Sequence, residues 1–202
     1  MIEWTVRLGL TPYAEALEDM ALRADKIYQG LKPERILLVE HPPLYTAGTS
    51  AKQEDIKQPD RFPIFQTGRG GEYTYHGPGQ RVVYPAINLR PRGRDVRAYV
   101  AQLEGWIIAA LRTFRIEAFL LEKHVGVWVG SPDKPAKIGA IGVRIRRWVT
   151  LHGFSVNVHP DLDHFSGIVP CGLTFPVTSM KALGVDVGLN EFDDALVRTC
   201  PF

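Results

Sequence analysis

Apolar residues recur at helical spacing in two segments of the chain, and each segment predicts an amphipathic helix. The first begins after Thr11 and Pro12, a helix cap and a first-turn proline, and ends at Gly30. The second follows the capping residue Asp95, and a third helix, opened by acidic residues, is predicted over 190–198. The second helix has the clearest apolar stripe, at Val96, Tyr99, Val100, Leu103, Ile107, Leu111 and Phe114. We expect this stripe to lie in the core.

Short apolar runs of strand length separate the helices and dominate the second half of the chain. They predict strands over 35–40, 63–67, 72–76, 81–89, 116–121, 124–130, 136–145 and 148–158. The segment 41–48 (HPPLYTAG) is too rich in proline and glycine to continue a strand, and the chain after Pro160 is expected to be irregular up to the last helix. Strands and helices do not alternate strictly, which disfavours a Rossmann fold or a TIM barrel. The pattern predicts one α+β domain over residues 1–202, with helices against a mixed or antiparallel sheet.

The composition of the 202-residue chain, with 45% apolar and 23% charged residues, excludes a fibrous, collagen-like or largely disordered protein. Lys and Arg number 24 against 22 Asp and Glu, so no nucleic-acid partner is expected. The segment 1–10 does not resemble a signal peptide, and no apolar run approaches the ~20 residues that span a bilayer. We therefore expect no membrane association and a cytoplasmic location.

Two cysteines, Cys171 and Cys200, are too few for a disulfide framework or a thiolate metal site, which fits a reducing compartment. Cys171 lies in the segment 169–172 (VPCG), where proline and glycine can present the thiol at a cleft. A small buried apolar residue is the alternative interpretation. The pKa of a free thiol is ~8.5, so a catalytic cysteine needs a cation or a base beside it. Cys200 has no comparable setting, and no role is assigned to it.

Lys137 places a charge on a strand of small and apolar residues, 136–142 (AKIGAIG). Its side chain needs a partner if it points inward, and the alternative is an edge-strand lysine that hinders aggregation. His41 and His76 are candidates to line a cleft or to make local hydrogen bonds only. The segment 159–164 (HPDLDH) fits no familiar zinc spacing, so no metal site is predicted there.

The glycine-rich segment 68–80 (GRGGEYTYHGPGQ) is the least ordinary part of the chain. Glycines let backbone amides approach a ligand, and Arg69 offers a fork of donors for a carboxylate, a phosphate or a carbonyl oxygen. The segment matches neither GxGxxG nor the Walker pattern, so it is not a standard nucleotide loop. A pair of tight hairpin turns is the structural alternative.

Residues 69–80 closely resemble the RGGxxTxHGPGQ signature of the lipoyl(octanoyl) transferase family, the octanoyltransferases of lipoate biosynthesis. Further segments agree in order and spacing: 40–43 with 46–48, Lys137 through His152 and Gly153 to Asn157, and 170–172. The resemblance runs from about residue 35 to residue 172. It departs at Glu72 and Tyr73, where the family more commonly has Gln and Val.

The resemblance implies a fold shared with biotin and lipoate protein ligases, and a ping-pong acyl transfer that needs no cofactor and no metal. It implies that Cys171 attacks octanoyl-acyl carrier protein and holds the octanoyl group as a thioester, while Lys137 lowers the pKa of Cys171 and shuttles protons. The implied acceptor is a lysine of an apo lipoyl domain, in 2-oxoacid dehydrogenase complexes and in the H protein of glycine cleavage. The implied substrate pocket is lined by Arg69, Gly70, Gly71, Glu72, Tyr73, Thr74, Tyr75, His76, Ala140, Ile141, Gly142, Gly153, Phe154 and Ser155.

Two other functions stay open at this point. An ATP-dependent lipoate or biotin ligase on the same fold would use Lys137 to hold an acyl-adenylate, but such ligases do not need the segment 170–172. A non-enzymatic module that binds carrier or lipoyl domains would need neither the thiol nor the lysine.

Overall fold

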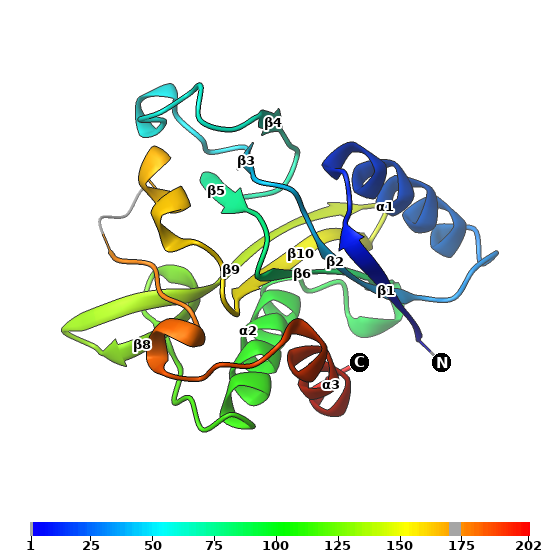
Figure 1. Cartoon of the computed structure of the whole chain (residues 1–202). Helices are drawn as coiled ribbons and strands as arrows, with labels where there is room; N and C mark the ends of the chain where they lie inside the picture. Colours follow the sequence, from blue (N-terminus) through cyan, green and yellow to red (C-terminus); the bar gives the residue numbers. More distant parts are fainter. Residues whose placement is uncertain (1, 170–174) are drawn as a thin grey trace.

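The computed structural model describes residues 2–169 and 175–202, and its central element is a seven-stranded sheet (Figure 1). The strand order is β1 (Glu3–Leu10), β2 (Arg35–Glu40), β6 (Gln80–Ala86), β10 (Val149–Asn157), β9 (Lys134–Arg146), β8 (His124–Ser131) and β7 (Phe119–Leu121). β1 runs parallel to β2, and the other neighbouring pairs are antiparallel. This mixed sheet, with helices packed on it, confirms the predicted α+β class.

The helix α2 (Val96–Arg112) covers one face of the sheet, and α3 (Leu189–Thr199) packs beside it (Figure 1). As predicted, Asp95 caps α2, because its carboxylate accepts hydrogen bonds from the backbone of Arg97 and Ala98 at 2.9 and 3.0 Å. The predicted stripe is buried at Tyr99, Leu103, Ile107 and Leu111. These residues form one apolar cluster with inward-facing strand residues, including Ile36, Val83, Phe154 and Val156.

The helix α1 (Tyr13–Tyr28) covers the opposite face, where Ala16 and Met20 pack on residues of β2 and β6. The prediction that Thr11 caps this helix is wrong. Pro12 occupies the cap position, and no side chain hydrogen bonds to the helix start. Thr11 instead continues the strand pairing, since its N–H donates to the carbonyl of Glu40 at 2.7 Å.

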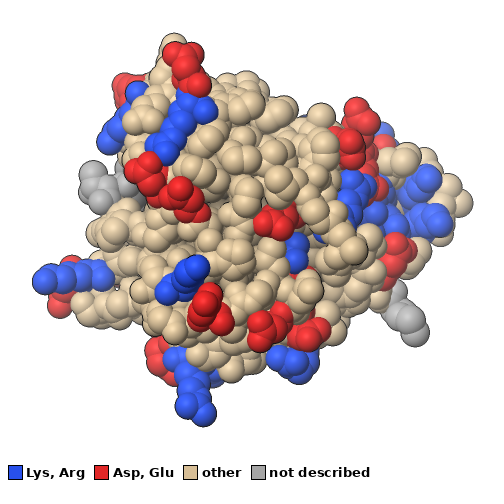
Figure 2. Space-filling view, in the orientation of Figure 1, with Lys and Arg blue, Asp and Glu red and all other residues tan. Residues whose placement is uncertain are grey.

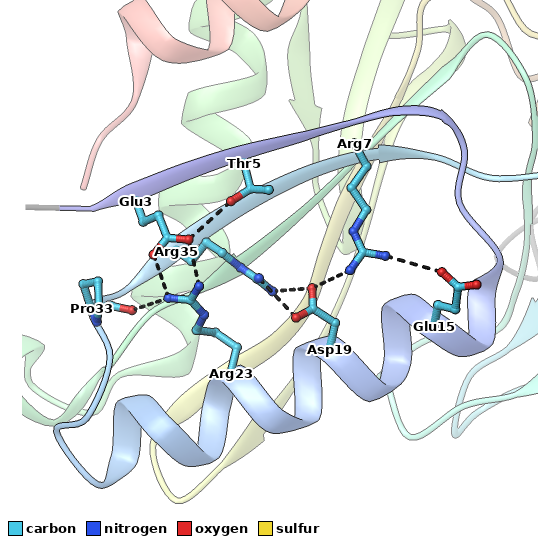
Figure 3. Close-up of polar contacts among 8 residues, drawn as sticks. All are labelled: Glu3, Thr5, Arg7, Glu15, Asp19, Arg23, Pro33 and Arg35. Carbon is cyan, nitrogen blue, oxygen red and sulfur yellow. Dashed lines mark hydrogen bonds and ion pairs between the residues drawn. The ribbon is translucent and has the colours of Figure 1, made fainter.

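Ion pairs hold α1 to the first two strands of the sheet (Figure 3). The carboxylate of Asp19 accepts hydrogen bonds from Arg35 of β2 at 2.8 Å and from Arg7 of β1 at 3.1 Å. Arg23 pairs with Glu3 at 2.8 Å. Because Arg35 is buried, its charge needs such a partner, and Asp19 thereby joins one helix to two strands.

A second, three-stranded sheet lies on the same side of the large sheet as α1 (Figure 1). Its order is β4 (Ile64–Gln66), β3 (Leu44–Ala47) and β5 (Tyr73–His76). Its own apolar cluster is largely aromatic and includes Tyr45, Tyr73, Tyr75 and Phe165. The rings of Tyr13 and Phe65 lie 5.1 Å apart, and Gly70 donates to the carbonyl of Val143 at 3.0 Å. These contacts join the small sheet to α1 and β9.

The prediction missed β1 and wrongly placed β3 in a loop. All of β3 is buried and hydrogen bonds to β4 and β5, so tertiary pairing overrides the two prolines that precede it. β1 does carry the alternation of a strand, at Trp4, Val6, Leu8 and Leu10, and the prediction overlooked it. In the structure it is an edge strand that exposes Val6 and Leu8. The other predicted strands and helices are present, with ends that differ by a few residues. Short 3₁₀ helices occur at Gln53–Asp55, Arg90–Arg92, Leu162–Gly167 and Lys181–Leu183.

Acidic and basic side chains are mixed over the face of the molecule shown in Figure 2. Oppositely charged side chains also pair over the described surface, as at Arg61 with Asp163 and Arg146 with Asp25. The nearly balanced net charge of +2 is therefore also balanced locally on this face. Among the described residues, no helix is long and apolar enough to cross a membrane.

Candidate functional site

A cavity of about 390 Å³ lies between the small sheet and the α1 side of the large sheet. The lining includes the predicted pocket residues Arg69, Gly71, Glu72, Tyr73, Thr74, His76, Ala140, Ile141, Gly142, Gly153, Phe154 and Ser155, together with the predicted catalytic residue Lys137. The structure thus brings the three predicted pocket segments together around one space. A volume of this order is that of a small-molecule site.

Two predicted pocket residues, Gly70 and Tyr75, are not part of this lining. The hydroxyl of Tyr75 makes a 2.8 Å hydrogen bond with Nδ1 of His164, and its ring packs in the aromatic cluster of the small sheet. Tyr75 alternates with Thr74 and His76 along β5, so it faces the opposite side of the strand. Gly70 holds the loop to β9 through its backbone.

Lys137 is only 7% exposed and lies on β9, where it pairs with Trp128 of β8 on one side and with Val177 on the other. It is therefore not an edge-strand lysine. Its Nζ lies 5.1 Å from the centroid of the Trp128 ring, within the range of a cation–π contact. Gly126 makes room for this side chain, because a Cβ built on Gly126 would lie 2.6 Å from Cε of Lys137.

Cys171, the predicted nucleophile, lies outside the described residues, as does the rest of 170–174. After this segment, the backbone of Lys137 donates to the carbonyl of Pro176 at 2.8 Å and accepts from Thr178 at 2.9 Å. The second cysteine, Cys200, is half-buried beside the α2 cluster. Burial raises the pKa of its thiol, which makes it a poor nucleophile.

Arg69 is buried, and its guanidinium donates to protein oxygens across the loop. Its acceptors include the hydroxyl and the carbonyl of Thr46, at 2.7 and 2.8 Å, and the carbonyl of Glu72 at 2.9 Å. The predicted fork of donors is therefore used to fix the glycine-rich loop against β3. Gly48 allows this close approach, since a Cβ there would lie 2.1 Å from the carbonyl oxygen of Gly71.

Three buried histidines, His41, His76 and His152, lie at or beneath the cavity wall. Desolvation lowers the pKa of His41 to about 4, of His76 to about 3 and of His152 to about 4. Nearby Arg69 lowers the pKa of His76 and His152 further. All three are therefore neutral at pH 7. The two alternatives for His76 are both realised, because it lines the cavity and also hydrogen bonds to Gln80 at 2.6 Å.

Sequence reasoning did not find several residues of the lining: Tyr13, Ser50, Val82, Tyr84, Lys123, His124 and Val125. They come from separate elements, so no local motif marks them. The alternation of Val82 and Tyr84 along β6 is the one signal available, because it places both side chains on the face that carries Ser155. Among the described residues, no group of three or more His, Cys, Asp or Glu is arranged to hold a metal ion.

The chain matches the model of the lipoyl protein ligase A/B catalytic domain over residues 12–200. It therefore belongs to this family of enzymes. Among its relatives, the octanoyltransferase of Rhizorhabdus wittichii is 57% identical over 201 residues, which cover 99% of this chain and 90% of the relative. The octanoyltransferase of Sphingopyxis alaskensis is 58% identical, over 98% of this chain and 92% of the relative.

Solved structures share the fold. The bi-partite lipoate protein ligase of Thermoplasma acidophilum has a TM-score of 0.71 at 19% identity, covering 98% of this chain and 82% of that one. A lipoate-protein ligase A bound with ATP has a TM-score of 0.70 at 20% identity, covering 98% and 83%. The biotin protein ligase of Aquifex aeolicus is more distant, with a TM-score of 0.50, 11% identity and coverage of 98% and 66%. The predicted kinship of fold with lipoate ligases is thus confirmed.

Proposed function

We propose that this chain is an octanoyltransferase of lipoate biosynthesis that carries the octanoyl group as a thioester on Cys171. The donor is octanoyl-acyl carrier protein. The acceptor is a lysine of an apo lipoyl domain, in 2-oxoacid dehydrogenase complexes and in the H protein of glycine cleavage. The whole chain, 1–202, acts as one catalytic domain in the cytoplasm, without a metal or a cofactor. Its membership of the family and its octanoyltransferase relatives support the reaction class.

The reaction has two acyl transfers. In the first, the Cys171 thiolate attacks the thioester carbonyl of the donor, and the carrier's thiolate leaves and takes one proton from Lys137. In the second, the acceptor amine attacks the new thioester, and the Cys171 thiolate leaves as the amide forms. The nitrogen loses one proton, which returns to the Cys171 sulfur or to Lys137. No oxidant, nucleotide or metal enters this balance.

The position of Lys137 is the observation that carries the proposal. A buried ammonium in the cavity wall favours an anion beside it, so it can stabilise a thiolate and the oxyanion of each transfer. The chain that follows Cys171 in sequence returns to this residue, since Pro176 and Thr178 hydrogen bond to its backbone. This supports a shared role for Lys137 and Cys171.

Small residues in the cavity wall leave room for an acyl chain. On the neighbouring strands β9 and β10, Ala140 pairs with Ser155 and Gly142 pairs with Gly153. Burial of an alkyl chain gains about 0.8 kcal/mol per methylene, so a medium-length chain can be selected by the depth of the space. Burial also keeps water from the thioester between the two transfers.

Intact-mass measurement tests the proposal. We expect the protein to gain one octanoyl group from octanoyl-acyl carrier protein, and to lose it on addition of an apo lipoyl domain. Cys171→Ser should form no thioester, and Lys137→Ala should form it at least about a hundredfold more slowly. Cys200→Ala is the matched control, with full activity expected.

The alternative function is an ATP-dependent ligase, which the similarity in fold to a lipoate-protein ligase A bound with ATP keeps open. Octanoyl transfer from the free acid that requires ATP and magnesium, with no adduct on Cys171, would replace our proposal by an acyl-adenylate mechanism. Binding of lipoyl domains without turnover would instead leave a non-enzymatic module.

A further inference from the structure

A cluster of four aromatic rings lies at the cavity wall, and the proposed thioester chemistry assigns these rings no role. The cluster consists of the rings of His41, Tyr13, His76 and Tyr84. Ring centroids of neighbouring members lie 5.2 to 6.4 Å apart. Tyr13, His76 and Tyr84 line the cavity, and His41 lies behind them with no exposed surface. Their hydrogen bonds determine which atoms donate and which accept.

The tautomer of His76 is fixed by a chain of hydrogen bonds that ends on backbone carbonyls. The Asn157 amide donates to the carbonyl of Thr178 at 2.9 Å, so its oxygen faces Gln80. The Gln80 amide nitrogen donates to that oxygen at 2.9 Å and to the carbonyl of Tyr75 at 3.2 Å. The oxygen of Gln80 therefore accepts from Nδ1 of His76 at 2.6 Å. With the proton on Nδ1, Nε2 of the neutral ring carries a lone pair.

The hydroxyl of Tyr84 is oriented in the same way. His41 lies 2.7 Å from the carbonyl of Thr11 through Nδ1, and a carbonyl only accepts, so Nδ1 carries the proton. Because burial keeps His41 neutral, its Nε2 accepts the hydroxyl proton of Tyr84 at 2.8 Å. The oxygen of Tyr84 is left with lone pairs. Two residues of the cavity lining, His76 and Tyr84, thus each have an acceptor atom with a lone pair, Nε2 and Oη.

We propose that His76 Nε2 and Tyr84 Oη receive the two N–H groups of the acceptor lysine and orient its amine for attack on the thioester. This inference rests on the proposed function and deepens it. A neutral primary amine has one lone pair, which must point at the thioester carbonyl, and two N–H groups, which two acceptors satisfy. The acceptors take no net proton. The proton that the nitrogen loses goes to the sulfur or to Lys137, as described above.

The charges around the cavity favour the neutral amine. Even without Lys137, the lining carries Arg69 and Lys123 against one carboxylate, that of Glu72, so a protonated acceptor amine would meet a net positive charge. Only the neutral amine is a nucleophile, so this repulsion helps the second transfer. His76 stays an acceptor throughout, because burial keeps its pKa near 3.

Single-turnover kinetics test the inference, with the thioester formed first and an apo lipoyl domain then added in excess. His76→Asn keeps a donor for Gln80 but has no atom at the place of Nε2, whereas His76→Gln reaches that place with an amide oxygen and loses the Gln80 contact. Because His76 lines the cavity, thioester formation can also slow in both variants, but we expect it to slow far less than the transfer step. Transfer to the lipoyl domain should slow by at least about tenfold in His76→Asn, and less in His76→Gln.

Tyr84→Phe should also slow the transfer step, while Tyr99→Phe, which removes a buried hydroxyl on the α2 side of the sheet, should not. Equal transfer rates in His76→Asn and the parent enzyme would overturn the inference. Slowing of thioester formation alone would also overturn it, because the cluster would then serve the donor. A milder effect of His76→Asn than of His76→Gln would overturn it as well, because it indicates a structural role of His76 through Gln80. Failure of the parent to form any thioester would instead refute the proposed function.

Discussion

The Lys137 ammonium lies over the ring of Trp128, with Nζ 5.1 Å from the ring centroid. The two residues are directly opposite each other in the pairing of β8 with β9, so their side chains share one face of the sheet. Both are buried. A desolvated cation over an aromatic face is held by about 2 kcal/mol, so Trp128 positions the group that we propose to activate Cys171.

Substitution of Trp128 should therefore slow thioester formation. Trp128→Phe keeps a weaker ring face, and Trp128→Leu removes it, so we expect a loss of up to about thirtyfold in the leucine variant and a smaller loss in the phenylalanine variant. Rapid-quench measurement of thioester formation across a pH series checks this, since a displaced ammonium should also shift the profile. Trp148→Leu, at a surface ring covered by Arg94, is the control. Equal losses at both tryptophans would show an effect on stability alone.

The direction of Lys137 could not be predicted from the sequence. Simple alternation with Ile141 and Val143, which pack on the α2 cluster, would turn the lysine to the α2 side. The register of β8 and β9 shifts between these positions, because Val127 pairs with Gly139 whereas Trp128 pairs with Lys137. The extra residue, Ile138, is buried in the α2 cluster, and the lysine turns to the cavity. The bulge appears in the sequence only as a shift of the apolar positions, from 136 and 138 to 141, 143 and 145, and the small residues Gly139 and Ala140 between them hide where the shift occurs.

Local signals predicted other parts of the molecule well. The cap at Asp95 and the apolar stripe of α2 depend only on residues a few positions apart, so the local sequence is sufficient to predict them. The pocket segments were expected only because the chain resembles a known family. In contrast, β3 forms only through pairing with distant strands, and Tyr13 and Tyr84 enter the cavity from separate elements. The ring cluster is therefore a property of the tertiary structure.

Arg69 should not tolerate replacement by lysine. A lysine has no planar fork, so it leaves acceptors at Thr46 and Glu72 without their donors in a buried site. We expect Arg69→Lys to lower the free energy of unfolding by about 3 kcal/mol and to loosen the cavity loop. Urea unfolding at pH 7 measures the loss. Arg61→Lys, at an exposed ion pair with Asp163, should change stability little, and a comparable loss there would contradict the explanation.

The buried histidines make the fold sensitive to acid. The pKa values of His41, His76 and His152 are lower in the folded state than in the unfolded chain, where they are near 6.5. The unfolded state thus binds more protons below pH 6.5, and stability falls as the pH drops from about 6.5 towards 4. Protonation of one such histidine in the folded state costs on the order of 3 kcal/mol.

Asp193 opposes this trend. Burial raises its pKa to about 6 despite its ion pair with Arg81, so its contribution is present at low pH and is lost as the pH rises through about 6. We expect urea midpoints to fall steeply between pH 6 and pH 4 with the histidines dominant. His152→Gln should flatten this slope by about one proton. Midpoints that rise towards pH 4 would mean that the histidines are not buried as neutral groups.

The size of the side chain at Ala140 should determine which length of acyl chain the enzyme prefers. Its side chain lines the cavity opposite Ser155, so Ala140→Leu fills space that the terminal methylenes of an octanoyl group would occupy. Two excluded methylenes change the preference by roughly fifteenfold, at about 0.8 kcal/mol each. We expect the ratio of octanoyl to hexanoyl thioester, with both acyl-carrier donors in competition, to fall by about that factor relative to the parent enzyme, as measured by intact mass. Ala101→Leu, on the exposed side of α2, makes the same change away from the cavity and should leave the preference unaltered. If Ala140→Leu slows both donors equally, the acyl chain does not extend past this residue.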